Sequence, residues 1–242
     1  MTKKIALIVG AGVSLGSSLA KVFAEDQYII VAVRRNGEEL SLLKKQIEKN
    51  DGICHTFSLD ARNESDVVEF INKVEDEIGT IDVAIYNIGA NINFSITETT
   101  SQKYHKVWEM AAFGAFLIGR EVAKKMILRK KGTIMFTGAT ASIRGGEGFA
   151  AFAGAKNAKR ALAQSMAREL GPKGIHVAHI IIDGAIDTPW INETFPDFAK
   201  EKKRLDGLMN PDDIAKNYLW IHKQEKNSWT HELDLRPWNE KW

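Results

Sequence analysis

The chain has 242 residues, of which 44% are hydrophobic and 26% charged, an ordinary balance for a soluble globular protein. Its 33 Lys and Arg residues nearly balance its 31 Asp and Glu residues, and the formal net charge of +2 gives no reason to expect nucleic acid as a partner. No apolar run approaches the ~18 residues of a membrane span, and the single cysteine, Cys54, excludes an internal disulfide and suits a cytoplasmic location.

Short apolar runs alternate with amphipathic stretches along the chain. Near-continuous apolar runs predict strands buried on both faces, as in a parallel sheet. Repeated strand–helix units predict one doubly wound α/β domain over residues 1–242, with a mostly parallel seven-stranded sheet and helices on both faces. The predicted strands span residues 5–9, 28–33, 53–57, 81–86, 133–137, 175–182 and 233–235, and the predicted helices span 15–24, 38–49, 64–78, 102–129, 149–170 and 212–224.

The least regular stretch, residues 188–210, follows the sixth predicted strand and contains Trp190, Phe195 and Phe198. One interpretation is a flap on the substrate side of a binding site. The other is a surface helix that packs these aromatic side chains. The sequence leaves both interpretations open.

The turn between the first strand and the first helix, residues 10–16, is rich in small residues. Glycine permits a tight turn there and lets backbone N–H groups approach a pyrophosphate at the positive end of a helix. Many strand–helix turns use glycine for structural reasons alone, and the last glycine lies one residue later than in the common dinucleotide motif. The position at the start of the chain nevertheless predicts a Rossmann-type dinucleotide site. Its candidate residues are Gly10, Gly12, Ser14, Leu15 and Gly16.

Arg34 and Arg35 follow the second strand, where an acidic residue would bind the ribose 2′-OH of NAD(H). Two arginines favour the 2′-phosphate of NADP(H), so NADP(H) is expected rather than NAD(H). The alternative is a solvated start to the next helix. Asp60 and Ala61 follow the third strand, and Asp60 either accepts a hydrogen bond from the adenine amino group or caps the helix that begins at Glu64.

In their order along the chain, these pieces resemble the short-chain dehydrogenase/reductase family. Ser14 replaces the middle glycine of the family's first turn, Asn87 and Gly89 match its Asn-Asn-Ala-Gly segment, and residues 183–188 resemble its nicotinamide-binding Pro-Gly-x-x-x-Thr segment. The resemblance implies that a dinucleotide contacts Gly10, Gly12, Ser14, Leu15, Gly16, Arg34, Arg35, Asp60, Ala61, Asn87, Gly89, Lys156, Ile186 and Thr188.

The family's reaction uses an Asn-Ser-Tyr-Lys tetrad. Its tyrosine exchanges a proton with the substrate oxygen, and its lysine lowers the tyrosine pKa and binds the nicotinamide ribose. Lys156 matches the lysine, but Ala111, Ala139 and Phe152 occupy the asparagine, serine and tyrosine positions. A phenyl ring has no proton to give, so the usual general acid is absent. Thr140, next to the serine position, either contacts substrate or satisfies backbone at the strand end.

Two main functions follow. The first is an NADP(H)-binding oxidoreductase that acts on a small organic substrate through atypical acid–base residues, with Lys156 and Thr140 as candidate catalytic residues. The second is a nucleotide-binding pseudoenzyme, a sensor or scaffold. A third candidate is an interaction partner that binds no nucleotide. The resemblance also implies a homodimer or homotetramer through the helices 102–129 and 149–170. No metal site is expected, because no Cys or carboxylate cluster accompanies His176 and His179 of the sixth predicted strand.

Overall fold

The computed structural model describes residues 4–240. Seven strands form one sheet in the order β3-β2-β1-β4-β5-β6-β7, and every neighbouring pair is parallel. This architecture confirms the predicted doubly wound α/β fold with a single domain. The strands are β1 Lys4–Val9, β2 Ile29–Arg34, β3 Cys54–Ser58, β4 Thr80–Tyr86, β5 Gly132–Thr137, β6 Ile175–Ile182 and β7 Glu232–Leu235.

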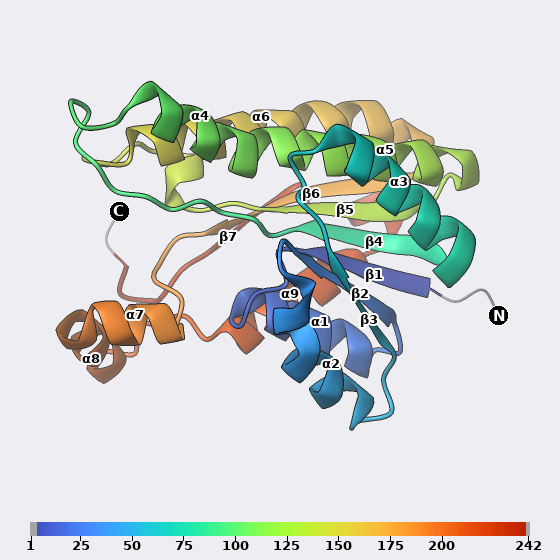
Figure 1. Cartoon of the computed structure of the whole chain (residues 1–242), viewed down its shortest axis with the longest axis horizontal. Coiled ribbons are helices and arrows are strands. Elements are labelled where there is room, and N and C mark those ends of the chain that lie inside the picture. The colour runs from blue at the N-terminus through green and yellow to red at the C-terminus, as the bar shows by residue number, and fades with distance from the viewer. Residues whose placement is uncertain (1–3, 241–242) are drawn as a thin grey trace.

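Helices cover both faces of the sheet (Figure 1). One layer contains α1 Leu15–Glu25, α2 Ser41–Glu48 and α9 Pro211–His222, and the other contains α3 Glu64–Lys73, α4 Ser101–Trp108, α5 Gly114–Arg129 and α6 Ala150–Leu170. Two short helices, α7 Pro189–Thr194 and α8 Pro196–Arg204, extend beyond the carboxyl end of the strands. The topology therefore leaves that edge open to strand–helix loops, which is where ligands bind in such sheets.

The alternation of side chains along β1 explains why the strand reads as an unbroken apolar run. Leu7 packs in the cluster under α3, α5 and α6, while Ile8 packs in the cluster under α1, α2 and α9. Both side chains are fully buried. Successive side chains of a strand point to opposite faces, so a strand between two helical layers needs apolar residues at every position.

The predicted helix 102–129 contains an interruption. A π-helical turn, Glu109–Phe113, separates α4 from α5, and the Tyr86 hydroxyl donates a hydrogen bond to the Met110 carbonyl at 2.6 Å. A second π turn, Val74–Ile78, follows α3. A π turn shifts the backbone ladder by one residue and leaves a carbonyl free to accept from outside the helix.

The segment 188–210 is mostly helical, as the surface-helix interpretation expected. Its aromatic side chains, however, are largely exposed to solvent rather than buried. Trp190, Phe195 and Phe198 are 56%, 47% and 44% exposed. Trp190 and Thr188 border a cavity described below, so the flap interpretation stays a prediction. Within residues 4–240, no helix combines the length and apolar character needed to cross a bilayer.

Candidate functional site

The turn between β1 and α1 is shaped by two glycines. Gly10 has φ +93°, a left-handed conformation that side chains disfavour, and its N–H donates to the Val33 carbonyl at 2.9 Å. A Cβ on Gly16 would collide with the Gly10 carbonyl oxygen and with Ala11. Gly12 is different, because a Cβ there would meet no heavy atom within 4 Å. The backbone at Gly12 therefore faces open space.

Ser14, which precedes α1, has a buried hydroxyl group that is free to bind a ligand. Its hydroxyl oxygen is buried yet finds no hydrogen-bond partner among residues 4–240. It lies at the amino end of the 11-residue helix α1, where backbone N–H groups carry partial positive charge. An unsatisfied hydroxyl beside a helix N-terminus fits the oxygen of a phosphate group.

Two adjoining cavities run along the carboxyl edge of the sheet on either side of this turn, with volumes of about 780 and about 530 Å³. They share Gly10, Gly12, Asn87 and Gly89. All the predicted cofactor residues line one or both. The larger cavity adds Ser14, Leu15, Gly16, Lys156, Ile186 and Thr188, and the smaller adds Arg34, Arg35, Asp60 and Ala61.

The smaller cavity has a charged wall. The Arg34 guanidinium forms an ion pair with Glu39 at 2.5 Å, and Asp60 forms one with Arg62 at the same distance. The hydrogen bond from Arg62 lowers the pKa of Asp60, so this carboxylate is charged and can only accept. The alternative role of Asp60 as a helix cap is wrong, because the Asn63 side chain caps α3.

Three of the four tetrad-like positions, those of Ala139, Phe152 and Lys156, line the larger cavity. The buried Lys156 ammonium donates to the carbonyls of Thr137 at 3.0 Å and Gly138 at 3.4 Å. Its Nζ lies 5.4 Å from the centre of the Phe152 ring, and Phe152 and Ala139 line the same cavity. No hydroxyl therefore stands beside Lys156 at the Phe152 position. Ala111 is fully buried in a cluster between α4 and α6.

Thr140 also lines this cavity, but its hydroxyl is already engaged. It donates to the Asp183 carboxylate at 2.5 Å. Asp183 is 1% exposed and also forms ion pairs with Arg144 at 3.7 Å and Arg236 at 3.5 Å. The alternative that Thr140 satisfies backbone is wrong, because its partner is this buried side chain.

Lys159 is a residue that sequence reasoning missed. It is fully buried, donates to the Ile88 carbonyl at 3.1 Å and lies 5.5 Å from the Tyr86 ring centre. Lys156 lies one helical turn earlier on the same helix, α6. Burial lowers the pKa of Lys156 to about 8, and burial together with the Lys156 charge brings the pKa of Lys159 well below its usual range. The available signal was a lysine in an otherwise alanine-rich helical stretch.

The two histidines of β6 have separate partners. His179 Nδ1 lies 3.0 Å from the Glu232 carboxylate, and His176 Nε2 lies 2.8 Å from the Thr230 carbonyl. The His176 ring also stacks on Trp229 with ring centres 4.7 Å apart. Within residues 4–240, no group of three or more His, Cys, Asp and Glu side chains gathers as a metal site would need.

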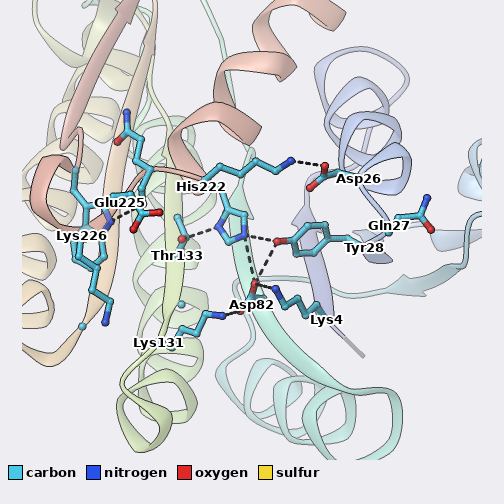
Figure 2. A pocket seen from close by; sticks show the side chains of 15 residues that line it. Lys4, Asp26, Gln27, Tyr28, Asp82, Lys131, Thr133, His222, Glu225 and Lys226 are labelled. Carbon is cyan, nitrogen blue, oxygen red and sulfur yellow. Dashed lines mark hydrogen bonds and ion pairs between the residues drawn. The ribbon is translucent and has the colours of Figure 1, made fainter. Parts of the chain in front are cut away.

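A third cavity, of about 670 Å³, lies at the opposite, amino edge of the sheet. Figure 2 shows the His222 ring between Thr133 and Tyr28, with Asp82 below. The two His222 nitrogens lie 2.8 Å from the Thr133 hydroxyl and 2.7 Å from the Tyr28 hydroxyl. These groups satisfy one another and join α9 to β4, to β5 and to Tyr28 just before β2, which indicates a structural role.

Known proteins resemble the chain over nearly its full length. The family model for short chain dehydrogenase matches residues 4–198. A solved short-chain dehydrogenase from Rhodopseudomonas palustris is 44% identical, with a TM-score of 0.84 that covers 98% of this chain and 100% of that one. The 3-oxoacyl-[acyl-carrier-protein] reductase of Thermotoga maritima is 25% identical over 228 residues, 93% of this chain and 92% of the relative. An alcohol dehydrogenase from Thermococcus sibiricus, solved with 5-hydroxy-NADP, is 24% identical with a TM-score of 0.87 over 98% of each chain.

Proposed function

The chain belongs to the short-chain dehydrogenase/reductase family, and from that premise we propose that it is an NADP(H)-binding oxidoreductase acting on a small organic substrate. One observation carries the proposal. The glycine turn and the N-terminus of α1 open onto adjoining cavities that extend from Arg34 and Arg35 at one end to Lys156 at the other. A dinucleotide bound along this edge would place its adenosine end at the arginines and its nicotinamide end at Lys156.

The residues along these cavities fit NADP(H). The buried Ser14 hydroxyl and the open backbone at Gly12 would hold the pyrophosphate, and Arg34 and Arg35 would hold the 2′-phosphate. Lys156 would bind the nicotinamide ribose. Bound NADP(H) would supply or accept the hydride. Structures of similar fold from Thermococcus sibiricus and a metagenomic source were solved with 5-hydroxy-NADP and NADP, which supports the same choice for this chain.

The substrate end of the larger cavity is largely apolar. Its walls include Phe149, Phe152, Ile182, Trp190 and Ile191. Such a lining favours a substrate that is mostly hydrocarbon around the reacting carbonyl or alcohol carbon. Trp190 and Ile191 belong to α7, so the segment 188–210 would contribute the substrate-side wall.

A pseudoenzyme that binds NADP(H) without turnover is the second candidate. Phe152 and Ala139 favour it, because neither side chain carries an exchangeable proton. Cofactor binding supports both candidates, and hydride transfer supports the first alone.

Calorimetric titration with NADPH and NADH tests the cofactor choice. We expect NADPH to bind at least roughly tenfold more tightly, because a charge-assisted hydrogen bond to a phosphate contributes about 1.5–3 kcal/mol. The double variant Arg34→Ala, Arg35→Ala should abolish the preference, whereas Lys44→Ala on the exposed face of α2 should keep it. Equal affinities in the wild type, or a preference for NADH, would contradict the assignment. A substrate screen followed at the NADPH absorbance then separates the oxidoreductase from the pseudoenzyme.

A further inference from the structure

The larger cavity is lined by cations and by no acid. Among the residues of the described chain, 4–240, that line it, Arg144 and Lys156 carry a charge and none is Asp or Glu. Lys156 is 3% exposed and lies where the nicotinamide ribose would bind, whereas the Arg144 side chain is 42% exposed. A cavity lined by one sign of charge attracts ligands of the opposite sign. The cofactor phosphates would lie at the glycine turn and at the smaller cavity, so the charge of Arg144 faces the substrate.

The backbone at Arg144 is fixed at the substrate end of the cavity. A short turn, Thr140–Ser142, follows β5, and the Arg144 N–H donates to the Thr140 carbonyl at 3.1 Å. The Asn157 side chain of α6 donates to the Ala141 carbonyl at 2.9 Å, which anchors this turn on the helix. The base of the Arg144 side chain is therefore held beside the position where a substrate carbonyl would lie.

A buried carboxylate positions the guanidinium group. Asp183, directly after β6, is 1% exposed, and its Oδ1 accepts a hydrogen bond from the Thr140 hydroxyl at 2.5 Å. The same oxygen lies 3.7 Å from a terminal nitrogen of Arg144. This separation exceeds a hydrogen bond, so the ion pair attracts the guanidinium without using one of its five N–H donors. Because Thr140 and Arg144 approach one oxygen, the guanidinium lies close to the residue that follows the serine-like position.

The charges behind Arg144 alternate in sign. The second oxygen of Asp183 lies 3.5 Å from Arg236, and Arg236 also pairs with Asp234. Two acids and two arginines thus balance one another, and Arg144 is the member of this group that lines the cavity. An anion beside Arg144 would continue the alternation and accept charge-assisted hydrogen bonds from the guanidinium.

We propose that Arg144 is a specificity-determining residue that binds a carboxylate group of the substrate, so that the substrate is an oxo acid in reduction and a hydroxy acid in oxidation. This inference rests on the proposed oxidoreductase function and names its substrate class. One guanidinium matches the single charge of a carboxylate, whereas a phosphate monoester carries closer to two. The apolar walls that include Phe149, Phe152 and Trp190 would contact the remainder of the substrate.

Calorimetry with aryl oxo acids tests the assignment without turnover. Benzoylformate and benzoylpropionate, which differ in the separation of carbonyl and carboxylate, are titrated into protein saturated with NADP⁺. Their uncharged methyl esters are titrated in parallel. A ketone and an oxidised cofactor cannot react with each other, so binding alone is measured. We expect at least one acid to bind at least roughly tenfold more tightly than its ester, because a hydrogen bond to a charged group is stronger than one to a neutral group.

Three variants separate recognition of the carboxylate from a structural role. Arg144→Gln should lower the affinity for the acid to that of its ester and leave the affinity for the ester unchanged. Arg144→Lys should keep part of the preference, because the charge remains but the planar fork of donors is lost. Arg168→Gln, which removes an exposed arginine in the last turn of α6, should keep the whole preference. Where the acid is reduced with NADPH, Arg144→Gln should raise KM and leave kcat nearly unchanged, as expected when binding is lost equally in the ground and transition states.

Several outcomes would overturn the inference. Equal affinities for acid and ester in the wild type, or a loss in Arg144→Gln that affects both alike, would mean that Arg144 only holds its own loop. Binding of neither acid to the NADP⁺ complex would also contradict it. If NADP(H) itself does not bind, the proposed function fails. A preference for acids that depends on Arg144 in the cofactor-free protein would then mark an anion site without a substrate role. Should Arg144→Gln not fold, as judged by circular dichroism, Arg144→Lys and the wild-type comparison of acid and ester decide.

Discussion

Asp82 shows how a single buried charge is maintained in this protein. Burial alone would raise the pKa of Asp82, but the hydrogen bond from His222 and the positive charges of Lys131 and Lys4 outweigh it and hold the pKa at about 2. The lysines lie 3.7 and 3.8 Å from the carboxylate. The folded protein therefore prefers the charged form more strongly than the unfolded chain does.

This preference predicts a pH-dependent loss of stability. The shift from 3.8 to about 2 corresponds to roughly 2 kcal/mol. Because the folded pKa is the lower one, the contribution is complete above about pH 4 and disappears as the pH falls towards 2. Asp82→Asn should cost roughly 2 kcal/mol in urea unfolding at pH 7, and the difference from wild type should shrink at pH 3. A difference that is constant between the two pH values would contradict the assignment.

The substitution Phe152→Tyr tests whether the absence of a tyrosine hydroxyl at this position limits the reaction rate. The new phenol would lie beside the Lys156 ammonium, whose nearby charge lowers a tyrosine pKa. We expect kcat to rise by about a hundredfold, the low end of the range typical of general acid–base catalysis. Adding Ala139→Ser should increase it further. Phe152→Leu is the matched control, and a similar gain in that variant would mean that the phenyl ring had acted by bulk.

At the scale of elements, two glycines of the turn between β1 and α1 allow protein stability and cofactor binding to be tested separately. Gly16→Ala places a methyl group against the Gly10 carbonyl and should lower the free energy of unfolding by about 1–3 kcal/mol. Gly12→Ala meets no neighbour and should leave stability unchanged, but it should weaken NADPH binding if the pyrophosphate lies against that backbone. Thermal unfolding and calorimetry on both variants measure the two effects. Normal NADPH affinity in Gly12→Ala would place the pyrophosphate elsewhere.

The five inner strands were predictable because they are buried on both faces, which requires a near-continuous apolar run in the sequence. The edge strands β3 and β7 are only partly buried. The helices were predictable in position but not in detail. The π turn Glu109–Phe113 depends on the Tyr86 hydroxyl and on Gly114, where a Cβ would collide with that hydroxyl. Helical periodicity contains no sign of a partner that arrives from β4.

The candidate site was predictable as a set of segments, because the carboxyl ends of parallel strands meet at one edge. The partners of its side chains were not. Asp60 was open to a capping role until the structure placed Asn63 at the start of α3. Lys159 became notable only through its burial beneath the Ile88 carbonyl, a contact between residues 71 positions apart.

At the scale of the whole molecule, an aromatic surface on α4 and α5 predicts self-association. The rings of Trp108 and Phe113 stack with centres 5.9 Å apart, and Phe113 stacks on Phe116 at 6.2 Å. Trp108 and Phe116 are each 38% exposed. We expect a homodimer or homotetramer in sedimentation equilibrium, because clustered exposed aromatic residues mark protein interfaces.

The double variant Trp108→Lys, Phe116→Lys should dissociate this assembly. Trp220→Lys, which changes an exposed aromatic residue on the opposite helical layer, should not. A wild-type protein that sediments as a monomer at micromolar concentration would contradict the prediction of self-association.

The partnership of Glu232 with His179 and Arg160 has a consequence for biosynthesis. The carboxylate comes from the last strand of the sheet, whereas its two partners come from β6 and α6, which the ribosome makes more than fifty residues earlier. A nascent chain can therefore assemble the first six strands while these partners still lack their anion. The region around the buried Lys156 and Lys159 reaches its final electrostatic state late in translation, when β7 joins the edge of the sheet.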